Sequence, residues 1–220
     1  AVDAVIIATP PAPRFDLARR ALEAGKHLLL EKPIALHADQ ARELQRLALA
    51  RGLSVAVDYE YRAVPLFMQA ARLLQAGAVG TPWLVKLDWL MGSRADPQRG
   101  WNWYAQADQG GGVIGALGTH AMDMLAWLIG PLGAVQALNS VSIKQRPHPD
   151  GGLAAVDAPD VSLLQTVAHW QGKQELSVPV QVSLSSVSRE GRGFCLDVVG
   201  SSGSLLLSST NQKDYVHGFE

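Results

Sequence analysis

The chain has 220 residues, of which 48% are hydrophobic and 18% charged, so it can build a core and does not have the composition of a disordered segment. Its formal net charge of -1 provides no electrostatic attraction for nucleic acid or for an anionic membrane, and we expect neither as a partner. Cys195 is the only cysteine, which excludes an internal disulfide and favours a reducing compartment such as the cytoplasm.

The first third of the chain predicts alternating strands and helices. The apolar run at residues 4–8 predicts a fully buried strand, and residues 27–30 and 54–59 predict two more. Residues 14–24 and 38–51 have apolar side chains at helical spacing, and each segment runs into a glycine. Strands that are joined by helices through short links run parallel with right-handed crossovers. We therefore predict an α/β unit, namely the C-terminal half of a Rossmann-type sheet.

The glycine-rich phosphate loop that opens such a fold is missing from this pattern. The glycine run Gly110-Gly111-Gly112 does not follow an apolar strand and is not that loop. The first residues already resemble an interior strand, and Asn211–Glu220 add no closing element. We therefore expect a chain that is truncated at its N-terminus and also at its C-terminus.

The middle of the chain has a different pattern. Residues 65–75 and 114–129 predict helices, and Gly130-Pro131 ends the second one. Residues 83–90 alternate as a strand does, and residues 92–112 predict a loop rich in glycine, aspartate and tryptophan.

The last third predicts strands in succession. Residues 144–160 are polar and contain proline and glycine, which predicts a mobile loop. The strand-like runs that follow are 161–170, 175–186, 193–199 and 203–208. Consecutive strands indicate a mostly antiparallel open sheet and an α+β class. We predict a partial dinucleotide-binding domain at residues 1–60 and a domain for substrate binding and oligomerisation at residues 61–220.

Lys32 is the first candidate for chemistry, because it follows a predicted buried strand with Glu31 and Pro33 beside it. Ligands of open α/β sheets bind at this edge. A partly desolvated lysine there can hold a substrate hydroxyl and stabilise a developing alkoxide. The alternative is an ordinary lysine in a surface loop.

Thr9-Pro10-Pro11 ends a strand at the same edge, where it can pack on a cofactor or simply form a strand-to-helix turn.

His120 is the second candidate. It lies on the predicted helix after the glycine run, and Asp123 lies three residues further on, on the same helix face. An imidazole near a carboxylate suits a general base. The alternative is a structural histidine close to a surface aspartate.

Aromatic and charged residues near these positions form a third group. Trp101-Asn102-Trp103-Tyr104 combines aromatic faces with an amide, which suits sugar recognition but also suits a cover over the core. Glu60 and Arg62 follow the third strand and can reach the same cleft or form a surface ion pair. No histidine or cysteine spacing predicts a metal site.

Together these motifs resemble the Gfo/Idh/MocA family of NAD(P)-dependent oxidoreductases. The similarity is specific in order and spacing and covers nearly the whole chain. It comprises Ala8-Thr9-Pro10-Pro11, Ala21-Leu22-Glu23-Ala24-Gly25-Lys26-His27, Glu31-Lys32-Pro33, Arg62 with Pro65, Gly77-Ala78-Val79-Gly80, and Gly110-Gly111-Gly112 with Gly118-Thr119-His120 and Asp123.

The resemblance implies roles for these residues. Lys32 corresponds to a lysine that contacts substrate and nicotinamide, before a Lys–Pro bond that is often cis, and His120 corresponds to the acid/base histidine. The implied cofactor contacts, for NAD or NADP, are Ala8, Thr9, Pro10, Pro11, Glu31, Lys32, Pro33 and Arg62. The implied substrate contacts are Lys32, Trp101, Asn102, Thr119 and His120.

The chain departs from the family pattern at two positions. Many members have a carboxylate four residues before the histidine, where this chain has Ala116. Many have a histidine early in the first helix, where this chain has Arg14. The first departure matters more, because without that carboxylate His120 must act alone or with Asp123, or catalysis is weak or lost.

The resemblance implies hydride transfer between NAD(P) and a hydroxyl-bearing carbon of a sugar, polyol or related metabolite. It also implies a homo-oligomer that associates through the open face of the antiparallel sheet. One alternative is an NAD-dependent glycosidase on the same fold, which oxidises a sugar only transiently. The other is a non-catalytic protein that binds a sugar or the cofactor.

Overall fold

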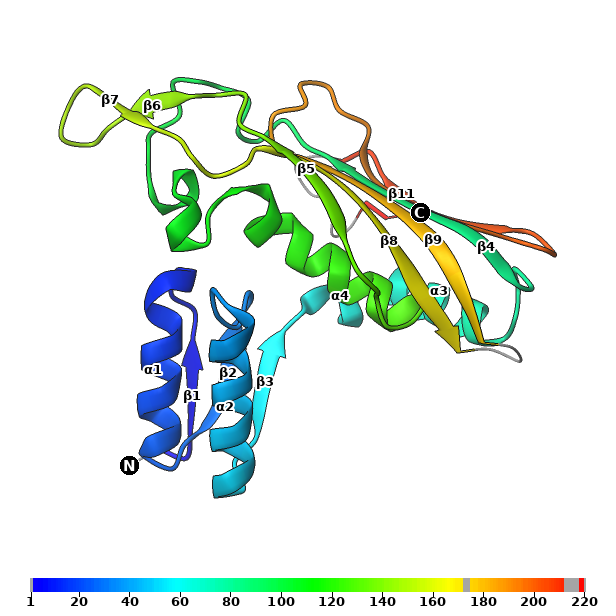
Figure 1. The fold of residues 1–220 in the computed structure, drawn as a ribbon, viewed down its shortest axis with the longest axis horizontal. Helices are drawn as coiled ribbons and strands as arrows, with labels where there is room; N and C mark the ends of the chain where they lie inside the picture. The colour runs from blue at the N-terminus through cyan, green and yellow to red at the C-terminus, as the bar shows by residue number, and fades with distance from the viewer. Residues whose placement is uncertain (1, 172–174, 212–217, 220) are drawn as a thin grey trace.

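The computed structural model describes residues 2–171, 175–211 and 218–219, which form two larger sheets flanked by helices and a separate two-stranded sheet (Figure 1). The first sheet contains β1 (Ala4–Ile7), β2 (His27–Glu31) and β3 (Val55–Asp58), all parallel and in that order. The helices α1 (Pro11–Glu23) and α2 (Ala38–Arg51) connect these strands. The predicted parallel α/β unit is therefore confirmed.

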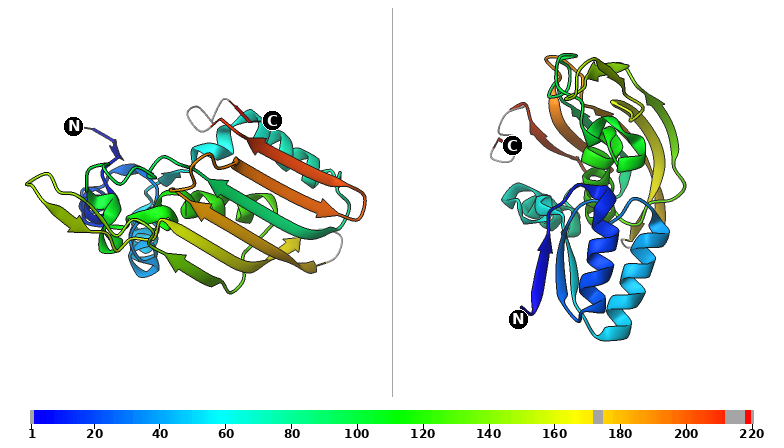
Figure 2. Two further views of the ribbon diagram at one scale, coloured as in Figure 1. Left: turned by 90° about the horizontal axis from the view of Figure 1, so that it is seen from above. Right: turned by 90° about the vertical axis from the view of Figure 1, so that its left-hand side faces the viewer.

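Both connecting helices cover the same face of this sheet (Figure 2, right). Leu22, Leu30 and Leu44 are fully buried between the helices and the strands. Ile6 points to the other face and is 72% exposed. The prediction of a fully buried strand at residues 4–8 is therefore wrong, because the described helices cover one face only and β1 lies at the edge of the sheet.

The second sheet has six strands in the order β11-β10-β4-β9-β8-β5. Their bounds are β4 (Pro82–Leu90), β5 (Gln136–Ser140), β8 (Val161–Gln171), β9 (Glu175–Ser185), β10 (Gly193–Gly200) and β11 (Ser204–Ser209). The β4–β9 pair is parallel and the other pairs are antiparallel, so the predicted mostly antiparallel sheet is confirmed. The Gln171-Gly172-Lys173 sequence, which predicts a turn between two of these strands, lies largely outside the described residues.

Two helices pack on one face of the second sheet, and no described helix covers its other face (Figure 2, left). They are α3 (Pro65–Gln75) and α4 (Thr119–Leu128). Trp89, Phe67 and Phe194 fill the interface, and the ring centroids of Trp89 and Phe194 are 5.2 Å apart in an edge-to-face contact. The strands of the second sheet therefore share one core with α3 and α4.

The helix at 114–129 begins irregularly. Residues Ile114–Gly118 form a π-helical turn, and only then does α4 begin. Such turns leave backbone groups without their usual helical partners and often occur at functional sites. Here the turn lies directly before His120.

The segment at 144–160 contains a hairpin, so the prediction of a mobile loop there is wrong. β6 (Gln145–Pro147) pairs with β7 (Leu153–Ala155). Arg146 is only 7% exposed, and its guanidinium donates hydrogen bonds to the carbonyl oxygens of Arg94 and Asp96. A buried arginine thus anchors the hairpin to the preceding loop. The composition of residues 144–160 alone does not indicate this contact.

The described helices include none that is both long and apolar enough to cross a membrane.

Candidate active site

The carboxyl ends of β1 and β2 form a cavity of about 380 Å³ together with the π-helical turn. Its lining residues are Ala8, Thr9, Pro10, Pro11, Arg14, Glu31, Lys32, Pro33, Trp103, Gly115 and Ala116. They include every predicted cofactor-binding residue except Arg62. The fold thus brings residues from four separate segments to the sheet edge at which α/β proteins bind ligands.

A buried arginine connects the two strand ends. Arg14 is 2% exposed, and its guanidinium donates to the carbonyl oxygens of Thr9 and Pro33. The Lys32–Pro33 peptide bond is cis, as the resemblance implied. Burial lowers the pKa of Arg14, and the charge of Glu31 partly opposes this. Sequence reasoning noted Arg14 only as a departure from the family pattern and missed this structural role.

Lys32 projects from the end of β2 toward the π-helical turn. Its Nζ donates a hydrogen bond of 2.8 Å to the carbonyl oxygen of Ala116. Burial lowers the pKa of Lys32, the charges of Glu60 and Glu31 raise it, and Arg14 lowers it. At position 116 Lys32 therefore meets a backbone carbonyl and not the carboxylate that the resemblance implied.

His120 lies deep in the same region and is 4% exposed. Its Nε2 is 3.6 Å from Oε1 of Glu60, and its ring contacts Tyr61 and Tyr59 edge-on at centroid distances of 4.9 and 5.9 Å. Burial, and then the charge of Lys32, lower the pKa of His120 to about 3. The imidazole is thus neutral at neutral pH, and its Nδ1 is buried without a hydrogen-bond partner.

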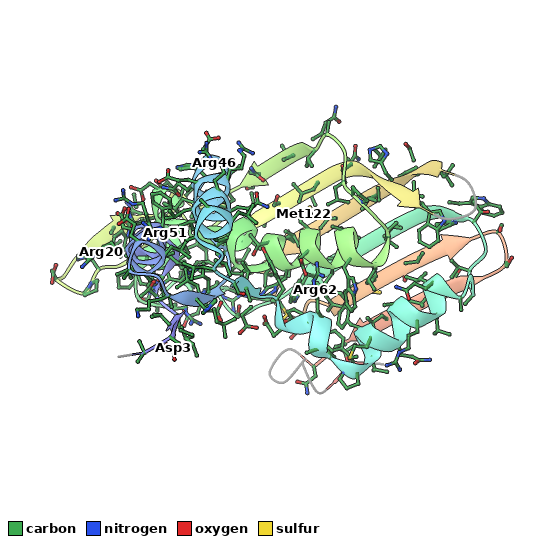
Figure 3. The ribbon with its side chains drawn as sticks, turned by 90° about the horizontal axis from the view of Figure 1, so that it is seen from below. Asp3, Arg20, Arg46, Arg51, Arg62 and Met122 are labelled. Carbon is green, nitrogen blue, oxygen red and sulfur yellow. The ribbon has the colours of Figure 1, made fainter. Side chains whose placement is uncertain are left out.

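Asp123 does not pair with His120, contrary to the prediction. It accepts two hydrogen bonds from Arg62, at 2.8 and 2.7 Å. Figure 3 shows Arg62 between the 3-10 turn η1 (Glu60–Ala63) and α4, and its guanidinium also lies 5.6 Å from the ring centroid of Trp127. The acid that approaches His120 is therefore Glu60, which follows β3. Position along α4 alone would have favoured Asp123.

The aromatic loop divides between two environments. Trp103 lines the cavity, whereas Trp101 donates from Nε1 to the carbonyl oxygen of Ala155 at 2.8 Å and packs on His148. Asn102 accepts a hydrogen bond from the backbone N–H of Tyr104 and so caps a short 3-10 turn. The structure thus brings Trp103 to the cavity with Lys32, whereas the predicted substrate contacts Trp101 and Asn102 do not line it.

A second hollow of about 420 Å³ lies beside α4. Tyr59, Thr119, Met122 and Asp123 contribute to its lining. The hydroxyl of Thr119 donates to the carbonyl oxygen of Gly115 at 3.0 Å. Thr119, a predicted substrate contact, therefore lines this hollow and not the cavity that contains Lys32.

The cavity suits the nicotinamide half of a dinucleotide. The hydroxyl of Thr9 is buried without a hydrogen-bond partner, and buried polar groups in native proteins normally have one. A carboxamide can supply that partner, and the prolines beside Thr9 offer an apolar surface for a flat ring. Among the described residues no three His, Cys, Asp or Glu side chains are grouped as metal ligands would be. The cavity thus combines a cation, a neutral imidazole nearby and a free hydroxyl.

Comparison with known proteins gives matches along nearly the whole chain. Residues 1–59 match the description "Oxidoreductase family, NAD-binding Rossmann fold", and residues 67–206 match the GFO/IDH/MocA C-terminal domain.

Three similar proteins illustrate these matches. An uncharacterized oxidoreductase from Synechocystis is 46% identical over 99% of this chain and 58% of its own length. A levoglucosan dehydrogenase from Pseudarthrobacter phenanthrenivorans is 31% identical over 70% of this chain and 40% of its own. A solved structure of a levoglucosan dehydrogenase with NADH and L-sorbose superposes with a TM-score of 0.83 at 26% identity, covering 94% of this chain and 54% of that one. The chain thus spans about half the length of the relatives it matches.

Proposed function

Because the chain belongs to the Gfo/Idh/MocA family of oxidoreductases, we propose that it carries the reaction centre of an NAD(P)-dependent dehydrogenase acting on a hydroxyl-bearing carbon. The observation that carries the proposal is a cavity lined by Lys32 and by an unpartnered Thr9 hydroxyl, with His120 near enough to Lys32 for the ammonium charge to lower its pKa. We also propose residues 1–60 as the dinucleotide-binding part and 61–220 as the part that binds substrate.

Each residue at the centre has a distinct task. The nicotinamide, when bound, supplies the hydride acceptor. Lys32 can turn its ammonium from the Ala116 carbonyl to the substrate oxygen and stabilise the charge that develops there. His120 is neutral and can therefore accept the hydroxyl proton at Nε2. Thr9, Pro10 and Glu31 hold the nicotinamide end of the cofactor.

We propose a sugar, a polyol or a related metabolite as the substrate. The dehydrogenase to which this chain is similar was solved with NADH and L-sorbose, and Trp103 offers an aromatic face to the cavity. The single cysteine supports a reducing compartment, and we propose the cytoplasm.

The test is turnover by the full-length protein with a panel of sugars and polyols. Production of reduced nicotinamide in a one-to-one ratio with oxidised sugar supports the dehydrogenase. Cleavage of a glycoside without net production of reduced nicotinamide identifies the glycosidase instead. Ala116 is the one observation that favours a non-catalytic protein, and binding of sugar and cofactor without any turnover would establish that alternative.

A further inference from the structure

Neither position 116 nor position 123 gives His120 a carboxylate partner from its own helix. Ala116 offers only its carbonyl oxygen, and Lys32 occupies it. Asp123 is bound by Arg62 through two hydrogen bonds. Glu60, by contrast, reaches His120 from η1, with Oε1 at 3.6 Å from Nε2.

We propose that Glu60 is the carboxylate partner of His120, and that it receives the substrate proton from His120 Nε2 and releases it to solvent. This inference rests on the dehydrogenase function proposed above. The substrate O–H bond breaks as the Nε2–H bond forms, and the Nε2–H bond then breaks as an O–H bond forms on Glu60. The C–H bond of the substrate carbon breaks as its hydride passes to the bound oxidised nicotinamide, and water takes the proton from Glu60.

The exposure of the two side chains supports this direction of transfer. The His120 side chain is 4% exposed, whereas that of Glu60 is 47% exposed. A proton on His120 therefore has no direct route to bulk water, but a proton on Glu60 does. The 3.6 Å separation is slightly longer than a hydrogen bond, and catalytic hydrogen bonds are often this loose until substrate binds.

The charges around His120 show why its protonated form needs a negatively charged partner. Burial and Lys32 disfavour the imidazolium form of His120, whose pKa is about 3, and the rings of Tyr59 and Tyr61 bring no opposite charge. A carboxylate beside Nε2 lowers the cost of transient protonation.

Glu60 itself is more basic than an ordinary glutamate. Its pKa is raised by burial, while its backbone hydrogen bond and Lys32 lower it and Asp58 and Glu31 raise it. A carboxylate with a raised pKa binds a proton more tightly than a carboxylate with an ordinary pKa. It therefore suits proton transfer near neutral pH.

The deciding experiment compares Glu60→Gln with wild type in the full-length enzyme. Glutamine keeps the shape and removes the charge. We expect kcat to fall about tenfold to a hundredfold, KM values for sugar and cofactor to stay within about threefold, and the acid limb of the kcat–pH profile to disappear. Glu60→Asp should recover part of kcat. Glu43→Gln, an exposed carboxylate on α2, is the matched control and should behave as wild type.

Several outcomes would overturn the inference. If Glu60→Gln keeps the wild-type kcat and pH profile while His120→Ala is inactive, Glu60 takes no part in the reaction. The proposed dehydrogenase function would still hold. A change in KM alone would assign Glu60 to binding. If Glu60→Gln does not fold by circular dichroism, Glu60→Ala decides by the same criteria.

A measurement without turnover separates this inference from the proposed function. In ¹⁵N-histidine-labelled protein, the Nε2 signal of His120 should move as Glu60 titrates and should stay flat in Glu60→Gln. A flat wild-type signal would refute the pair even in an active dehydrogenase. A moving signal in a protein that oxidises no sugar would support the pair while the proposed function fails.

Discussion

At the residue scale, charged groups lie close together in a site whose side chains are largely buried. Lys32 is surrounded by Glu31, Glu60 and Arg14, and each changes its pKa. The hydrogen bond from Lys32 to the Ala116 carbonyl fixes the direction of the ammonium without adding a negative charge. Lys32 is therefore held near the cavity by a partner that a substrate oxygen can replace.

Lys32→Ala should lower kcat of the full-length enzyme by about a hundredfold or more, because one preorganised electrostatic stabiliser of the alkoxide is lost. Steady-state kinetics with the best sugar or polyol measures this. Lys144→Ala removes an exposed lysine of the same charge and should leave kcat unchanged. Near-normal turnover in Lys32→Ala would contradict the role given to this residue.

His120 should make stability depend on pH. Its pKa is about 3 in the folded protein against an ordinary 6.5, so between these values the unfolded chain binds a proton that the folded chain does not. The free energy of unfolding should therefore fall on acidification below pH 6.5, with a slope of up to about 1.4 kcal/mol per pH unit.

Urea unfolding at a series of pH values tests this expectation. His120→Gln should show a shallower pH dependence, since its side chain does not titrate. His169→Gln, at an exposed position on β8, is the control and should keep the wild-type slope. Equal slopes in all three proteins would show that His120 is not the group responsible.

At the element scale, hydrogen bonds join the β6–β7 hairpin to the loop at residues 92–112. Arg146 donates to the carbonyl oxygens of Asp96 at 2.7 Å and of Arg94 at 2.6 Å. The indole N–H of Trp101 bonds the carbonyl of Ala155 on β7. Trp103 follows shortly afterwards, so the hairpin helps to set the wall of the cavity.

Arg146→Met should lower the free energy of unfolding by about 2–4 kcal/mol, because several carbonyl oxygens lose a charged donor in a buried position. Chemical denaturation measures the loss. Hydrogen exchange should at the same time become faster in residues 92–100. Arg192→Met removes a half-exposed arginine elsewhere and should cost under about 1 kcal/mol. An equal cost for both variants would show that Arg146 does not anchor the loop.

At the scale of the whole molecule, one face of the second sheet carries apolar side chains that no described element covers. Ser162, Leu164, Thr166 and Ala168 of β8 are buried. The alternate positions point outward, and Leu163 is 46% exposed next to Leu138 at 69%. Exposed apolar patches of this kind favour association.

We predict that the full-length protein forms at least a dimer through this face. Leu163→Asp should shift it toward monomer in light scattering at micromolar concentration, since a charge would be buried at the interface. Leu49→Asp, at a position on α2 that is 74% exposed, should leave the mass unchanged. If light scattering shows only a monomer for the wild-type protein, the prediction is refuted.

Local patterns were sufficient for most of the fold. The helices at 38–51 and 65–75 were predicted with the observed bounds, because each has a clear apolar face and ends near a glycine. β5 was missed, since its five residues are all exposed and only pairing with β8 defines it. The hairpin at 145–155 was missed for a similar reason, because its anchor, Arg146, is distant in sequence from the carbonyls it binds.

The sequence by itself determined the parallel unit, the antiparallel sheet and the candidates Lys32 and His120, because strand-end positions and motif spacing are local properties. Only the tertiary structure decided which carboxylate meets His120. Asp123 is closer along the helix, yet Arg62 binds it, and Glu60 arrives from another element at 3.6 Å. Such pairings depend on how separate segments pack, and spacing along one helix carries no information about that.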